Sequence, residues 1–364
     1  MKELTPITRR IIDAAADIMQ DDATEIEYQH GILCQVGLPR KKIEGRVFER
    51  TFKNASIRIV AGELWDGKHW IEQPVPYGPK PRLALIYFNS EAIRTKNPHI
   101  EVGHSCAEFL RRIGLPDQDG RTYNLFKRQM TALAATELSL GFTTQNQAVT
   151  INARPIKEFR AWVGSDKNDR QQSLWPGELT LSTDYFESLM AHAVPLDPRA
   201  LGALSHSALA LDIYAFLARR LHELNKSVRI PFVSLKEQFG QEYQDLKPFK
   251  NKFLAAIQQV MAVYPEAHVE QVTGGIVLSP SNPPIKAPAK GRRIAVEKPK
   301  LLSPTPAAPN LSEATTEQFR KLCPRLDIYA CKADFDAWLA DKTQPKDYQR
   351  AFLGFAKKWG KGKN

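Results

Sequence analysis

Polar side chains between residues 246 and 264 have the types and the spacing needed to bind a nucleic acid. Lysine offers a cation to phosphate groups, whereas asparagine and glutamine can form paired hydrogen bonds with adenine in a major groove. At about 100 degrees per residue, Lys247, Asn251 and Gln258 share one face of a helix. The candidate nucleic-acid-binding residues of this stretch are Lys247, Lys250, Asn251, Lys252 and Gln258. An ordinary solvated helix face is the other interpretation of the same pattern.

The neighbouring residues predict a small domain that would position this helix. The expected elements are a helix over 203–224, a short strand over 229–233, a helix over 235–239 after Ser234, the polar-faced helix over 246–264, and a hairpin of 269–272 with 276–278. Gly274 and Gly275 permit the tight turn of the hairpin. This order is that of a winged-helix domain, in which the hairpin is the wing.

An earlier stretch of the chain predicts the same plan without repeating the residues. Its elements are a helix over 83–94, a strand over 100–102, helices over 106–113 and 122–138, and a hairpin of 138–142 with 148–151, with further strands over 158–162 and 177–182. The candidate nucleic-acid-binding residues here are Arg121, Asn124, Lys127, Arg128 and Gln129. The predicted fold class is therefore α+β, with tandem winged-helix domains. The first of them either binds DNA or forms a homodimer.

Several motifs, in this order, resemble the plasmid-encoded RepA family of replication initiators. They span residues 76–83, 91–95, 108–110 with 114–115, 211–214, 238–243, 263–267 and 274–278. Pro231 departs from the pattern, which would have a strand without proline there. The resemblance implies that the chain binds repeated double-stranded DNA sites in a plasmid origin. It also implies that the chain recruits host replication initiation proteins and the replicative helicase.

The charge of the chain is unevenly distributed. The formal net charge is +11, and residues 280–364 hold seventeen Lys or Arg against eight Asp or Glu, a net of +9, so the first 279 residues carry only +2. The tail can therefore attract DNA without regard to sequence, whereas specific affinity must come from local faces. With 43% hydrophobic residues and no apolar run near the length of a membrane span, we expect a cytoplasmic protein.

Catalytic and metal-binding motifs are lacking, so we expect neither an enzyme nor a cofactor. The sequence contains no phosphate-binding glycine loop, no nucleophile elbow and no paired metal-binding histidines. Its four cysteines form no C-x-x-C pair and are expected to be buried thiols. His99, His104 and Cys106 lack a fourth ligand and the usual spacing of a zinc site, so we predict no metal.

The composition predicts five regions. These are an N-terminal helix and strands (1–75), a first winged helix (76–198), a second, DNA-binding winged helix (199–281), a disordered basic proline-rich linker (282–310) and a small helical module with a basic tail (311–364). The aromatic residues of the last region predict that it folds alone or docks on a partner. Two further functions stay open. One is a transcription repressor, possibly of the protein's own gene, and the other is an adaptor that no longer binds DNA.

Overall fold

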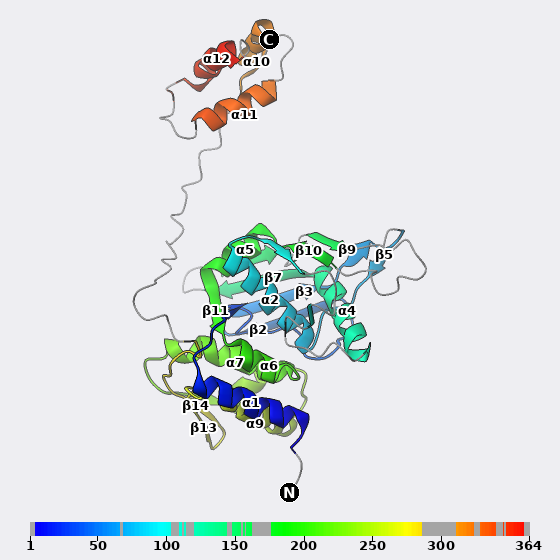
Figure 1. Ribbon diagram of the computed structural model, residues 1–364, viewed down its shortest axis with the longest axis vertical. Coiled ribbons are helices and arrows are strands. Elements are labelled where there is room, and N and C mark those ends of the chain that lie inside the picture. The colour runs from blue at the N-terminus through cyan, green and yellow to red at the C-terminus, as the bar shows by residue number, and fades with distance from the viewer. Residues whose placement is uncertain are drawn as a thin grey trace. The chain divides into compact units, whose positions relative to one another are not determined.

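The computed structural model divides the chain into two compact units, Met1–Ala287 and Pro288–Asn364, which are described separately below. It describes residues 4–65, 68–102, 109–110, 113, 120–143, 148–153, 156, 158–161, 176–285, 311–323, 328–339, 345 and 347–359. The first unit contains both helices and antiparallel strands, and the described elements of the second unit are helices, as Figure 1 shows. The predicted α+β class is therefore confirmed. In the described part of the chain, no helix combines the length and the apolar character that crossing a membrane requires.

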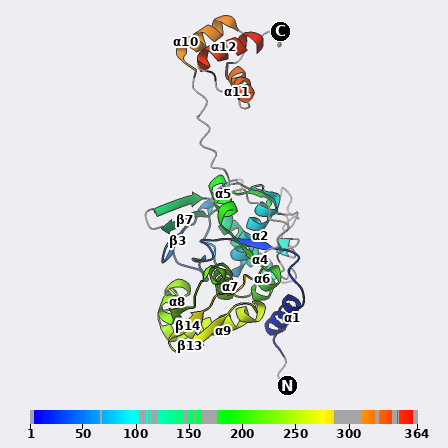
Figure 2. The ribbon, with the colours of Figure 1, turned by 90° about the vertical axis from the view of Figure 1, so that its left-hand side faces the viewer.

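Helix α7 (Ala208–Arg220) lies at the centre of the first unit and is buried from Ala208 through Ala218. Figures 1 and 2 show helix α9 (Leu246–Val263) and the hairpin of β13 (Val269–Val272) and β14 (Gly275–Leu278) together on one side of α7. Helix α2 (Pro79–Thr95) and the larger sheet lie on its other side. A helix buried over so many consecutive residues must be covered on all faces.

The predicted elements between residues 199 and 281 are present with two changes. The helix expected over 235–239 after Ser234 begins at Phe232, so the strand expected over 229–233 ends at Pro231 and Ser234 lies inside the helix instead of capping it. Strand β12 (Val228–Pro231), helix α8 (Phe232–Phe239), α9 and the hairpin follow in the expected order, and the strands form an antiparallel sheet in the order β12-β14-β13. The single helix expected over 203–224 is instead divided into α6 (Pro198–Leu204), α7 and a short 3₁₀ turn (Leu221–Glu223). The cause is a cap: the Ser207 hydroxyl accepts from the Ala210 N–H at 3.2 Å and begins a new helix.

Proline and glycine meet where β12 approaches the hairpin. Pro231 is the last residue of β12, opposite Gly275, and also the N-cap residue of α8. A proline is compatible with both places because neither requires its missing N–H to continue a ladder. Gly274 has a φ of +81°, and a Cβ on Gly275 would lie 2.3 Å from the Ile230 carbonyl oxygen. The predicted tight turn is present, but its two residues are Thr273 and Gly274; Gly275 is the first residue of β14, where a Cβ would not fit.

The larger sheet joins residues that lie far apart in the sequence. Its strands are β2 (Val47–Phe52), β3 (Ala55–Val60), β7 (Glu137–Thr143) and β8 (Ala148–Ala153), in the antiparallel order β2-β3-β7-β8. Ala55, Ile57 and Ile59 alternate into the core, as a half-buried strand requires. The expected hairpin after residue 138 is therefore present, but it pairs with an N-terminal hairpin as well.

The prediction of one helix over 122–138 is wrong at its end. Helix α4 runs from Gly120 to Ala134, and β7 begins at Glu137. Leu138 and Leu140 pair with Ile59 and Ile57 and are buried, so the strand pairing outweighs the helical pattern of these residues.

Strand β6 (His99–Glu101) distinguishes this region from residues 199–281. It pairs with β10 (Pro176–Thr180), which pairs with β9 (Glu158–Ala161), and not with the β7-β8 hairpin. Sheet pairing in the earlier region thus differs from that around α9, where the single strand β12 pairs with the β13-β14 hairpin. The helix expected over 106–113 lies largely outside the described residues.

The remaining elements of the first unit are shorter. They are α1 (Pro6–Gln20), the strand pair β1 (Glu27–His30) with β11 (Ala193–Leu196), the hairpin β4 (Glu63–Trp65) with β5 (Trp70–Glu72), and α5 (Thr183–His192). Residues before 76 therefore share sheets with residues after it. The five predicted region boundaries stay predictions.

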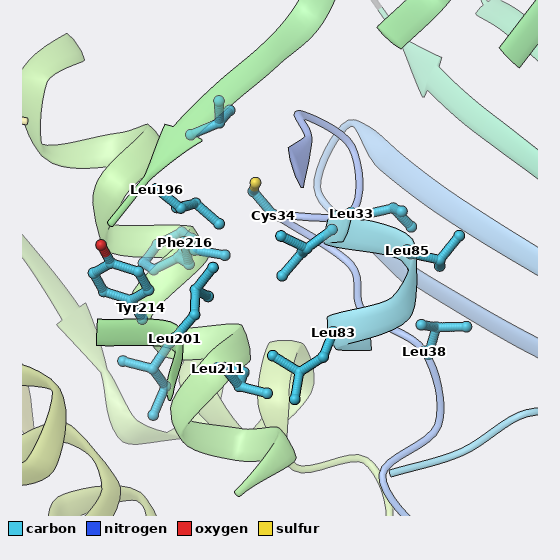
Figure 3. Packing of buried hydrophobic residues seen from close by; sticks show 14 of the residues in the cluster. Leu33, Cys34, Leu38, Leu83, Leu85, Leu196, Leu201, Leu211, Tyr214 and Phe216 are labelled. Carbon is cyan, nitrogen blue, oxygen red and sulfur yellow. The ribbon is translucent and has the colours of Figure 1, made fainter. Parts of the chain in front are cut away.

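A buried ion pair links α2 to α7. The Arg82 guanidinium donates to both carboxylate oxygens of Asp212, at 2.7 and 2.8 Å, and the two residues are 3% and 9% exposed. Its other N–H groups donate to the carbonyl oxygens of Leu38, Pro39 and Gly78. Figure 3 shows part of the apolar core of this unit, including Leu83 of α2 and Leu211 of α7, the residues next to Arg82 and Asp212 in the sequence. Every donor of the guanidinium is therefore used, which buried charges need.

The second unit is a small helical fold with its own core. Its described helices are α10 (Glu313–Leu322), α11 (Ile328–Leu339) and α12 (Tyr348–Trp359). Their buried residues are Phe319, Cys323, Cys331, Phe335, Phe352 and Ala356. The expectation that the aromatic residues build a folded module is confirmed. Most of the predicted linker falls outside the described residues.

The buried ion pair generates the first prediction. Asp212→Asn should lower the free energy of unfolding by about 3–5 kcal/mol, because it leaves the Arg82 charge buried without a counter-ion. Urea unfolding measures the change. Glu49→Gln is the control: it removes an exposed pair with Arg58 and should cost at most about 1 kcal/mol. Similar losses for the two variants would contradict the role of the buried pair.

Candidate nucleic-acid interface

One face of α9 anchors the helix and leaves the opposite face free. Its buried residues, spaced at three and four, are Phe249, Phe253, Ala256, Ile257, Val260 and Val263. Phe253 packs against Phe239 of α8 and against Phe249, with ring centroids 5.9 and 5.5 Å apart. A Cβ on Gly240 would lie 2.4 Å from the Phe249 ring, so the turn before α9 also depends on close packing. The helix is thereby fixed before any ligand binds.

The opposite face presents the residues that the sequence predicts. Lys247, Asn251, Lys252 and Gln258 are exposed, and so is Ala255, which lies between Asn251 and Gln258 on the same face. Helix α9 contains no Asp or Glu. The small alanine leaves the two amides unobstructed, and the lysines give the face a positive charge without internal neutralisation. Such a face can meet phosphates and base edges together.

Lys250 differs from the other lysines of α9. It is half-buried, and its Nζ lies 5.0 Å from the centroid of the Phe232 ring on α8. This cation–π contact draws the ammonium toward α8 and away from the exposed face. Lys250 therefore belongs at the edge of the surface rather than in its middle.

The other flank of α9 is attached to neighbouring helices. Helix α1 packs beside α9 and α6, as Figure 1 shows. Gln259 is bonded to His206 Nε2 at 3.2 Å, and His206 Nδ1 lies 3.2 Å from the Ala203 carbonyl oxygen. Burial lowers the pKa of His206, and its hydrogen bonds to Ala203 and Gln259 oppose this shift. These contacts leave the Lys247 face uncovered.

A cation beside the hairpin turn was missed by the sequence analysis. Arg229 of β12 is exposed, and its guanidinium donates to the carbonyl oxygen of Thr273 in the turn. The strand register explains the contact. Arg229 of β12 pairs with Val277 of β14, and β14 begins directly after the turn. Only the strand pairing brings this residue to the hairpin, so a helix-centred search of the sequence does not find it.

The earlier candidate helix, α4, is a mixed surface. Asn124 and Arg128 are exposed and Lys127 is half-buried. Gln129 is only 3% exposed, and its Oε1 accepts from the Tyr77 N–H at 2.7 Å. The prediction that Gln129 binds DNA is therefore wrong, because its amide is used to hold the chain before α2. The side chain of Arg121 lies outside the described parts of α4.

A partly buried charge cluster precedes α9, with two buried arginine side chains and the more exposed Glu242. Glu242 accepts from Arg40 and lies 3.8 Å from Nη2 of Arg50, which is 4% exposed. Burial lowers the pKa of the Arg50 guanidinium to about 10, with Asp212 opposing the shift, so Arg50 stays charged at neutral pH. The cluster joins the loop at residue 40 and strand β2 to the residues that lead into α9.

No candidate metal site is found within the described residues. His99 Nδ1 is bonded to the Thr180 hydroxyl at 2.9 Å, while His104 and Cys106 lie outside these residues. Three cysteines, Cys34, Cys323 and Cys331, are buried thiols. These three thiols therefore agree with the expectation of buried cysteines.

Comparisons with known proteins give a family for part of the chain. Residues 75–234 match the family described as plasmid encoded RepA protein, so the predicted resemblance is confirmed. The match runs from the residues before α2 into α8 and ends before α9. A comparison with curated proteins finds no match.

Two solved structures share similarity with the chain. The crystal structure of the RctB domains 2-3 has 11% identity and a TM-score of 0.44, and covers 68% of this chain and 94% of that chain. A selenomethionine structure of domain 2 and domain 3 of RctB has 10% identity and a TM-score of 0.45, and covers 70% of this chain and 98% of that chain.

Proposed function

We propose that this chain, in which residues 75–234 belong to the plasmid encoded RepA family, binds repeated double-stranded DNA sites at a plasmid origin and initiates replication there. The observation that carries the DNA-binding part is the exposed face of α9. Its lysines and amides lie on a helix without acidic residues, and the opposite face is fixed in the core. The protein acts by binding and recruitment, without covalent chemistry of its own.

The order of the elements around α9 supports a winged helix as the proposed motif. Helix α7, strand β12, helices α8 and α9, and the β13-β14 hairpin follow the order of this motif, and β12 pairs with the hairpin. In the proposed complex α9 enters a major groove and the hairpin approaches the phosphate backbone. Arg229, which is bonded to the hairpin turn, adds a cation at that point.

The polar residues of α9 have separate tasks in this complex. Asn251 and Gln258 can each pair with the N6 and N7 atoms of adenine, which gives sequence specificity. Lys247 and Lys252 contact phosphates, which position the helix without distinguishing sequences. Lys250 supports the edge of the surface through its contact with Phe232.

Helix α4 offers a second contact. Asn124 and Arg128 are exposed on it, so this face can meet the same DNA about one helical turn away. Formation of a homodimer through the same region is the competing use. If a monomer of the protein protects two major grooves one helical turn apart, the DNA contact by α4 is favoured over homodimer formation.

The second unit is proposed to recruit host initiation proteins and the helicase. Trp338 is 49% exposed, and its ring stacks beside Phe335 and Phe355 at 6.1 and 5.7 Å. An exposed tryptophan held by buried and half-buried aromatic rings on a small folded module is the kind of side chain that anchors a protein-docking surface. The basic residues of this unit add sequence-independent attraction to DNA.

The tasks proposed for α9 predict different defects for two substitutions. Asn251→Ala should cost about 1–3 kcal/mol on the specific site and little on random DNA, because it removes a base contact. Lys247→Ala should weaken binding to both DNAs alike and reduce the salt slope by about 1, because it removes a phosphate contact. Binding isotherms on specific and random duplexes over a range of salt concentrations measure both effects.

Lys226→Ala is the matched control for charge. Lys226 is exposed and precedes β12 at the end of the sheet opposite the Gly274 turn, since Val228 pairs with Leu278. It should leave both affinities unchanged. Equal losses on specific and random DNA for Asn251→Ala would refute the base-reading role.

Removal of residues 288–364 distinguishes the initiator from a transcription repressor. The remaining unit keeps α9 and its core, so we expect site-specific binding to persist while plasmid replication is lost. A transformation assay with a plasmid that depends on this protein measures replication, and a promoter fusion measures repression. Continued replication by the shortened protein would exclude the recruiting role of the second unit.

A further inference from the structure

A pocket of about 370 Å³ lies where several elements of the first unit meet. Its wall includes Arg10 of α1, Arg40, Lys80 at the start of α2, Leu125 of α4, and His206 in the turn before α7. Leu125 is 41% exposed, so the pocket reaches the surface at this residue. The volume is sufficient for a phosphate group with an attached sugar.

The charge of the wall is strongly one-sided. Arg10, Arg40 and Lys80 are cations, and none of the described residues that line the pocket carries a carboxylate. A neighbouring groove shows the usual arrangement, because Arg9, Arg10 and Arg199 line it together with Asp13 and Asp17. With three cations and no carboxylate among its described lining residues, the wall favours a bound anion.

Two arginines also have unused hydrogen-bond donors. The side chain of Arg40 is 6% exposed; its Nε and Nη2 donate to Glu242, while Nη1 is buried and has no partner among the described residues. Glu242 is shared with Arg50, so it neutralises the local arginines only in part. The Nε atom of Arg10 is likewise buried without a partner in this part of the chain. Unused buried donors of cations are costly unless an acceptor can bind there.

Some residues of the pocket wall belong to α4 or are bonded to α9, the two candidate helices. Leu125 and Gln129 of α4 line it, and His206 in its wall is bonded to Gln259 of α9. We propose that this pocket binds a phosphate group. The group comes from the backbone of DNA that lies across α4 and α9, or from a free phosphate or nucleotide. The first source rests on the proposed function, whereas the second does not.

The test compares pocket variants with controls at adjacent or identical positions in the full-length protein. Arg10→Gln removes a cation from the pocket, and Arg9→Gln removes its neighbour on α1, which lines the other groove. Leu125→Glu places an anion at the opening, and Leu125→Gln places an uncharged group of the same size there. Thermal unfolding without ligand checks that all four variants are folded.

If the phosphate belongs to DNA, Arg10→Gln and Leu125→Glu should each weaken binding about threefold to tenfold and lower the salt slope by about 1. Specific and random duplexes should be affected alike, and the two controls should bind as the unchanged protein does. Binding isotherms over a range of salt concentrations give the affinity and the slope together.

Inorganic phosphate tests the second source. At matched ionic strength it should raise the Tm of the unchanged protein and both controls, relative to chloride, but not that of Arg10→Gln or Leu125→Glu. A phosphate effect with unaltered DNA binding would assign the pocket to a free anion. The inference is overturned if Arg10→Gln and Leu125→Glu bind DNA with the salt slope of the unchanged protein and phosphate does not raise the Tm of the unchanged protein. Absence of any specific DNA binding would instead refute the proposed function, and the phosphate titration would then decide the pocket alone.

Discussion

The buried pair of Arg82 and Asp212 is the constraint on which the first unit depends. A guanidinium and a carboxylate removed from water are stable only when all their hydrogen bonds are made. Here the arginine bonds to α7 through Asp212 and to the chain at Leu38, Pro39 and Gly78. Gly37 has no room for a Cβ, which would lie 2.7 Å from an Asp212 oxygen. Because α9 packs on α7, this pair also sets where α9 lies relative to α2.

The motifs that resemble the RepA family lie largely at such junctions. Arg82 and Asp212 belong to two of them, and Gln238 of a third donates to the Gln35 carbonyl oxygen at 3.0 Å. Tyr264 of a fourth donates to the Asn282 carbonyl oxygen and packs edge-on against Tyr214. These residues hold the elements together, whereas the proposed base-reading residues lie outside them on α9.

Local patterns predicted the region around α9 well, because its helices and hairpin are specified by residues close in sequence. The Phe249 to Val263 stripe and the Gly274 turn needed no distant partner to be recognised. The earlier region was harder, since its strands pair with residues that lie far away in the sequence, such as Ala55 with Phe142 and Glu27 with Leu196. The local pattern predicts a helix at Leu138, but Leu138 pairs with Ile59 in the sheet. The same kind of pattern predicts that Gln129 faces solvent, but its amide accepts from the Tyr77 N–H. Neither contact leaves a periodic signal in the sequence.

The central claim is that α9 recognises repeated DNA sites. Its most direct test is a nuclease footprint of residues 1–287 on the DNA around the gene, at physiological salt with excess random competitor DNA. We expect protected repeats spaced about one or two helical turns apart, the spacing of major-groove readers on one side of a duplex. Protection of a single operator over the promoter would favour the repressor, and the absence of any protected site would contradict the account.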